Sequence, residues 1–169
     1  MKSFTVKNLA GFLRQLFVED SFDAFLVPEA VFVTGFTSSF DGRIPPNRTD
    51  AEEKEKDASA SSPDLYISWG QLKPLAQALV KGKTLPRSFS LVFTLSEAKT
   101  LAFLEAAGDP IPREMLGGLF LNIRYTREQL ILTSGCSLRQ FTPDRTLEQA
   151  WDRQLAGFLA RLGAVTDQD

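Results

Sequence analysis

The chain has 169 residues, of which 43% are hydrophobic and 24% charged, and its formal net charge is −2. These values are typical of globular proteins, and a chain of this length buries about 68–70% of its unfolded surface without needing disulfides or metals. It contains no histidine and one cysteine, Cys136, which excludes Ser-His-Asp and Cys-His catalysis, His-based or thiolate metal sites and an intramolecular disulfide. Carboxylate chemistry remains open, either with Mg²⁺ or as an acid–base pair.

The N-terminal segment does not have the pattern of a signal peptide, because Lys7 and Arg14 interrupt its apolar positions and no small-residue cleavage site follows. No apolar run approaches the roughly 20 residues that a membrane span needs. With a single cysteine, these features predict a cytoplasmic protein that does not act at a membrane and needs no cofactor.

In chain order, the first elements are a strand at 3–6 and a helix from about Asn8 to Glu19, with Asn8 as its N-cap. The next segment reads as two strands around a turn at Pro28–Glu29, because proline is common in turns. Asp41–Gly42 is a further turn signal.

Residues 45–64 predict a mobile loop, because they are rich in Pro, Ser, Ala and charge and contain no large apolar side chain. The loop has six acidic and three basic residues, a net charge of −3. Since the whole chain carries −2, the remainder carries +1. This nearly neutral remainder gives no overall charge signal for nucleic acid or membranes.

Three more helices follow by periodicity. One opens at Ser68, which has capping-box spacing to Gln71, and ends at Gly82. A strand at 88–95 leads to a helix at 96–107 that closes at Gly108. The last helix opens at Thr146, with Gln149 at capping-box spacing.

A hairpin around Thr126–Glu128 precedes the last helix. Its first arm alternates, with one face formed by Leu119, Leu121, Ile123 and Tyr125 and the other by Phe120, Asn122 and Arg124.

The stretch VTGFTSSFDGR at 33–43 has a faint echo in LTSGCSLRQF at 132–141. In both halves the order reads as strand, helix, three strands, helix. We therefore predict a single α+β domain over 1–169, with an antiparallel sheet and four helices, and possible duplicated halves at 3–80 and 88–162. The alternative is that any α+β chain can be read in this way.

Arg43 and Arg139 lie near the ends of the two matched stretches. One hypothesis is that these cations frame an anion site. The alternative is that they are turn residues facing solvent.

Residues 65–96 contain no acidic residue but carry Lys73, Lys81, Lys83 and Arg87. Such a basic stretch is suited to contact phosphates. The alternative is that lysines near the end of a helix complement its dipole and have no further role.

Four segments together carry a family resemblance: FDAFLVPEAVFVTGFTSSFDGRI, LVKGKTLPRSFSLVFTLS, GLFLNIRYTREQLILTSGCSL and TLEQAWDRQLAGFL. They resemble a small family of uncharacterised bacterial proteins, a domain of unknown function. The resemblance implies a cytosolic bacterial protein, and it transfers no catalytic residue because the family has no established activity. A weaker resemblance, in element order only, links YISWGQLKPLAQALVKGK and SFSLVF to the strand–helix–strand step of sliding DNA clamp domains.

The function that we predict is non-enzymatic: an interaction or ligand-binding protein whose partner is a ligand, another protein or a second copy of the chain. One alternative is a clamp-like protein that contacts nucleic-acid phosphates through the basic residues of 65–96. The other is a carboxylate- or Mg²⁺-dependent enzyme, for which distant acids would have to converge in a cleft.

Overall fold

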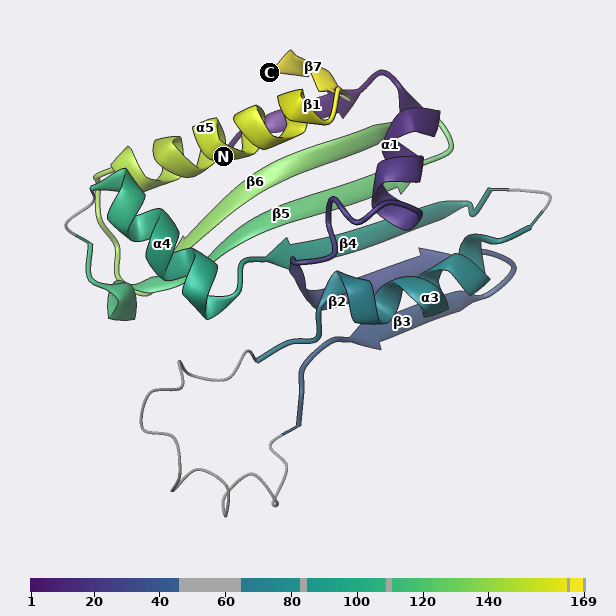
Figure 1. Cartoon of the computed structure of the whole chain (residues 1–169), viewed down its shortest axis with the longest axis horizontal. Helices are drawn as coiled ribbons and strands as arrows, with labels where there is room; N and C mark the ends of the chain where they lie inside the picture. Colours follow the sequence, from purple (N-terminus) through teal and green to yellow (C-terminus); the bar gives the residue numbers. More distant parts are fainter. Residues whose placement is uncertain (46–64, 83–84, 109–110, 164, 169) are drawn as a thin grey trace.

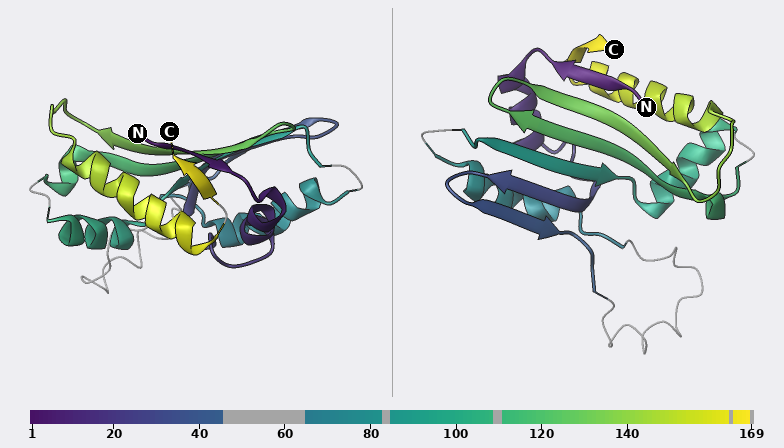
Figure 2. Two further views of the ribbon diagram at one scale, coloured as in Figure 1. Left: turned by 90° about the horizontal axis from the view of Figure 1, so that it is seen from above. Right: turned by 180° about the vertical axis from the view of Figure 1, so that it is seen from behind.

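The computed structural model describes residues 1–45, 65–82, 85–108, 111–163 and 165–168. These residues form one antiparallel sheet with helices packed on a single face of it (Figure 1, Figure 2). The predicted loop at 45–64 lies outside the described residues except for Pro45.

The described strands join in one seven-stranded sheet of order β3-β2-β4-β5-β6-β1-β7, in which every neighbouring pair is antiparallel. Their bounds are β1 Ser3–Val6, β2 Leu26–Val33, β3 Thr37–Asp41, β4 Ser88–Thr94, β5 Leu116–Thr126, β6 Leu130–Leu138 and β7 Val165–Gln168.

Four α-helices are described, together with one short 3₁₀ turn at Arg113–Met115. Their bounds are α1 Leu9–Phe17, α3 Trp69–Val80, α4 Glu97–Ala107 and α5 Thr146–Arg161. Seen from above, all four lie on the same side of the sheet (Figure 2). The predicted α+β class, with an antiparallel sheet and four helices, is therefore confirmed.

Side-chain caps explain why three of the helices begin where the sequence predicts. The Asn8 side chain accepts a hydrogen bond from the Gly11 amide at 3.0 Å. Ser68 and Gln71 form the complete reciprocal capping box at the start of α3. Ser96 caps α4, and Gly108 ends it in a left-handed conformation with φ of 62°, which glycine adopts without steric cost.

The capping box predicted at the start of α5 is wrong. Thr146 is the first helical residue rather than the N-cap, and its neighbour Arg145 makes no side-chain cap. Asp144 replaces the predicted cap, because its carboxylate accepts hydrogen bonds from the Thr146 amide at 2.9 Å and the Thr146 hydroxyl at 2.6 Å. Asp144 and Thr146 lie two residues apart and are both residue types that cap helices, so the sequence pattern alone does not show which of them is the cap.

The turn predicted at Pro28–Glu29 is also wrong, because both residues lie inside β2. The pairing of β2 with β4 shifts register between Leu26 and Glu29. A bulge of this kind tolerates proline within a sheet, since proline has no N–H to donate to the ladder.

The predicted hairpin is confirmed. β5 and β6 are joined by a tight turn in which the Thr126 amide donates to the Gln129 carbonyl at 2.9 Å. Along β5 the predicted inward-facing residues are buried, whereas Phe120 and Asn122 are half-buried and Arg124 is exposed. One face of the sheet therefore packs on the helices and the other lacks a helical layer.

The internal duplication is not confirmed. Among the described residues, each half has the order strand, helix, two strands, helix rather than the predicted three strands. The strand partners also differ between the halves. β4 lies between β2 and β5, whereas β1 lies between β6 and β7.

The core fills the space between the sheet and the helices, and it combines many aromatic side chains with leucines. Trp69 and Trp151 are both at most 1% exposed. Their indole N–H groups donate to the Leu16 carbonyl at 2.7 Å and to the Phe120 carbonyl at 3.0 Å. Buried indoles satisfied in this way hold α3 against α1 and α5 against β5.

Candidate functional site

Arg43 and Arg139 lie at the same end of the sheet, where β3 and β6 finish. A cleft of about 460 Å³ opens at this end, and Arg139 lines it together with Tyr66. Arg43 is exposed and is not part of that lining, although its backbone pairs with Tyr66 in an isolated bridge. The fold thus brings the two arginines to one end of the sheet, at the ends of strands separated by three others, and only Arg139 lines the cleft.

The charges in this cleft balance one another. Its described lining contains Arg113 and Arg139 but also Glu97 and Glu114. Arg113 is held by Glu97 in a two-point contact, with Nε–Oε1 and Nη2–Oε2 distances of 2.9 and 2.6 Å. An anion site framed by Arg43 and Arg139 therefore stays a prediction, and the cleft offers it no net positive charge.

The basic residues of 65–96 have different surroundings. The Lys73 ammonium donates to the Glu19 carbonyl at 2.9 Å and to the Asp23 carboxylate at 2.5 Å, and its side chain is 12% exposed. Lys81, the C-cap residue of α3, and Arg87, just before β4, are exposed. Lys83 lies outside the described residues. The ammonium group of Lys73 is therefore engaged in contacts within the fold.

The acidic residues after α1 do not form a metal site. Asp23 pairs with Lys73, and Glu19 pairs with Arg14 at 3.1 Å. Within the described residues, no group of three or more acidic or cysteine side chains lies close enough together to hold a metal ion.

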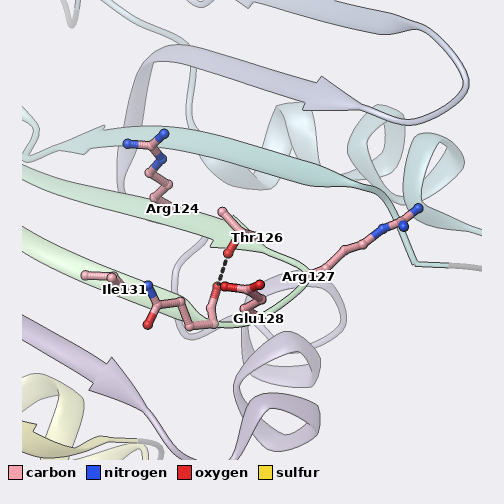
Figure 3. Close-up of a pocket in the computed structure, with 6 residues that line it drawn as sticks. Arg124, Thr126, Arg127, Glu128 and Ile131 are labelled. Carbon is pink, nitrogen blue, oxygen red and sulfur yellow. Dashed lines mark hydrogen bonds between the residues drawn. The ribbon is translucent and has the colours of Figure 1, made fainter.

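A shallow depression of about 510 Å³ lies at the tip of the β5–β6 hairpin, on the face of the sheet that lacks helices. In Figure 3 the guanidinium groups of Arg124 and Arg127 point in different directions. All of its described lining residues come from this single hairpin. Because its cations diverge, the depression does not concentrate charge on one point.

The arrangement best suited to hold a ligand is a groove of about 420 Å³ between α4 and α5, two helices on the covered face of the sheet (Figure 1). This volume falls within the roughly 300–1,000 Å³ of small-molecule sites. Residues of the 21–25 segment contribute to the lining, so the groove is bounded by three separate parts of the chain.

Aromatic side chains form much of the groove. The ring of Phe158 on α5 lies 5.7 Å from the ring of Phe25, measured between centroids. The ring of Phe103 on α4 lies 5.6 Å from Trp151 in an edge-to-face arrangement. Because Trp151 and Phe103 are buried core residues, this part of the lining is held in place by the fold itself.

The α4 wall is built from small side chains. Ala102 and Ala106 line the groove, and both are exposed. Four of the six exposed residues of α4 are apolar, namely Ala98, Leu101, Ala102 and Ala106. A helix that is apolar on both its inner and its outer side is usually covered on both sides.

Two cations, Lys99 on α4 and Arg161 at the end of α5, complete the lining, and Gln154 adds a neutral polar group. None of the described residues that line the groove is acidic. The arrangement therefore combines an aromatic interior with positive charge on both helices.

Sequence reasoning missed this groove. Lys99 and Arg161 belong to helices that are adjacent only in the folded chain. One signal was present, since EAKTLAFLEAA, the sequence of α4, places apolar residues around the whole helix.

Comparison with protein families gives one match. A family described as "Family of unknown function (DUF5721)" covers residues 15–164. The chain belongs to this family. The predicted resemblance to a domain of unknown function is thereby confirmed.

No curated protein and no solved structure matches the chain. The weaker resemblance to sliding DNA clamp domains is not supported. Within the described residues, no helix has both the length and the apolar character needed to cross a membrane.

Proposed function

We propose that this protein is a non-enzymatic binding protein and that the groove between α4 and α5 is its ligand site. The observation that carries the proposal is the combination of a preformed aromatic interior with the apolar, exposed outer side of α4. Exposed apolar surface around a concave site is the usual mark of a binding surface.

The two alternative functions have less support. A nucleic-acid role would use Lys73, whose ammonium is already bound by Asp23 and the Glu19 carbonyl. A carboxylate-dependent enzyme would need converging acids with raised pKa values. In the described residues two of the acids after α1 are instead paired with cations, Glu19 with Arg14 and Asp23 with Lys73.

A cytoplasmic location and a bacterial source are part of the proposal. The single cysteine, half-buried on β6, is consistent with a reducing compartment, because stabilising disulfides are typical of oxidising compartments and one cysteine forms none within the chain. An origin by internal duplication is likewise proposed, on the repeated order of elements alone.

A thermal-shift panel tests the binding site. Three eight-carbon compounds, octanoate, 1-octanol and octylamine, present the same apolar chain with different head groups. A ligand that binds only the folded state raises the unfolding midpoint by an amount that grows with the logarithm of its concentration relative to its Kd. We expect at least one compound to stabilise the wild-type protein, and Ala102→Trp to abolish the effect by filling the groove.

Ala98→Trp is the matched control, because Ala98 is also an exposed alanine of α4 but does not line the groove. It should leave the ligand-induced shift unchanged. Stabilisation that survives Ala102→Trp, or the absence of any shift across the panel, would contradict the proposal.

A further inference from the structure

We infer that the ligand of the α4–α5 groove is a small amphipathic anion: a free molecule with an apolar chain or ring and one carboxylate-like head. This inference rests on the proposed function and adds the chemical class of the ligand. Three features support it, namely the shape of the interior, the charge of the two helices and the size of the site.

The interior selects an apolar body. Phe25 and Phe158 pack edge to face where the 21–25 segment meets α5, and Phe93 stacks on Phe25 at a centroid distance of 5.7 Å. Phe103 and Trp151 close the α4 side. Burial of an alkyl chain here removes apolar surface from water, whereas a sugar or nucleotide body would lose hydrogen bonds to water without replacement.

The charge selects an anionic head. Lys99 and Arg161 are both exposed, and neither side chain has an ion pair with another described residue. The described lining offers no carboxylate to neutralise them. In contrast, the cations of the cleft at the sheet end share their lining with Glu97 and Glu114. An anion therefore gains most in the α4–α5 groove.

The size and position of the groove favour a free small molecule over a lipid bilayer. The groove lies between helices and holds about 420 Å³, a volume suited to a medium-chain acid. Phe103, Trp151 and Leu155, which line it, are at most 5% exposed, so the floor of the groove is set back from the protein surface and a flat membrane does not contact it.

The test uses calorimetric titration of the full-length protein with octanoate, 1-octanol and octylamine. We expect octanoate to bind more tightly than the two matched compounds, with an affinity that falls as salt is added. In the double variant Lys99→Glu, Arg161→Glu, octanoate affinity should fall by roughly tenfold or more, since the two cations that line the groove are replaced by anions that repel the head group. Lys81→Glu, an exposed cation outside the groove, should have no comparable effect.

The outcomes separate this inference from the proposed function. If 1-octanol or octylamine binds in the groove as tightly as octanoate, or if the double variant keeps its octanoate affinity, the ligand class is wrong while the binding site stands. If vesicles of anionic phospholipid bind and octanoate does not, the free-acid inference is also wrong. If no compound binds in a manner that Ala102→Trp blocks, the proposed function itself fails.

Discussion

Lys73 is the residue that links α3 to the segment after α1. Its ammonium donates to the Asp23 carboxylate and to the Glu19 carbonyl, and its side chain is largely buried. We predict that Lys73→Met, which keeps the aliphatic stem, lowers the free energy of unfolding by about 1–2 kcal/mol. The loss should be at the lower end of the range for charged hydrogen bonds, because Asp23 is one-third exposed and can rehydrate.

Urea unfolding measures this change, and Lys81→Met is its control. Lys81 is exposed and uses only its backbone amide at the end of α3, so its replacement should stay within about 0.5 kcal/mol of wild type. Equal effects at the two positions would show that the Lys73 contacts do not stabilise the fold.

Position 42 requires glycine because the backbone there lies very close to the backbone of Val27. A side chain at this position would overlap the carbonyl oxygen of Val27. The Gly42 amide also donates to the Pro28 carbonyl at 3.2 Å, and its carbonyl accepts from Ile67 at 2.9 Å. We predict that Gly42→Ala destabilises the protein by about 1–3 kcal/mol or more, because the backbones must separate.

Gly35→Ala is the comparison for Gly42→Ala. No atom lies within 4 Å of a Cβ placed at Gly35, and its φ is not in the left-handed region. Chemical denaturation should therefore find this variant neutral or slightly stabilised. A tolerated Gly42→Ala would mean that the approach of the two backbones is looser than described.

At the scale of elements, the start of α5 has a measurable pH signature. The Thr146 hydroxyl, and then the Thr146 amide, hold the pKa of Asp144 below its ordinary value of 3.8. A folded-state pKa that is lowered stabilises the protein above the unfolded pKa, and the contribution is lost as pH falls through the folded value. The loss is therefore confined to strongly acidic solution.

We predict that Thr146→Val raises the pKa of Asp144 towards 3.8 without reaching it, because the amide hydrogen bond remains. Carbon-13 NMR titration of the Asp144 carboxyl group measures both values. An unchanged pKa in Thr146→Val would assign the shift to the backbone alone.

Elements that depend on residues close together in the chain were predictable from the sequence. The caps at Asn8, Ser68 and Ser96 each join atoms three residues apart, and the alternation along β5 follows from strand geometry. Pro28–Glu29 was misread as a turn. Its proline lies instead at a register shift within the sheet, a tertiary feature that is invisible in a short window.

At the scale of the whole molecule, neither the order of the strands nor the groove could be predicted from the sequence. β1 pairs with β6, so that Phe4 lies opposite Leu132, and no local pattern specifies such a partner. The groove has the same origin, since Lys99 and Arg161 become neighbours of one cavity only when α4 and α5 pack on the sheet. Only the apolar outer side of α4 could have indicated it.

A ¹H–¹⁵N NMR titration with whichever of the three eight-carbon compounds stabilises the protein most locates the ligand on the protein. We expect shift changes to gather on residues lining the groove, such as Ala106, Gln154 and Phe158, and to vanish in Ala102→Trp but not in Ala98→Trp. Shift changes that gather instead on the cleft beside Arg139 or on the β5–β6 hairpin would contradict the proposed binding site.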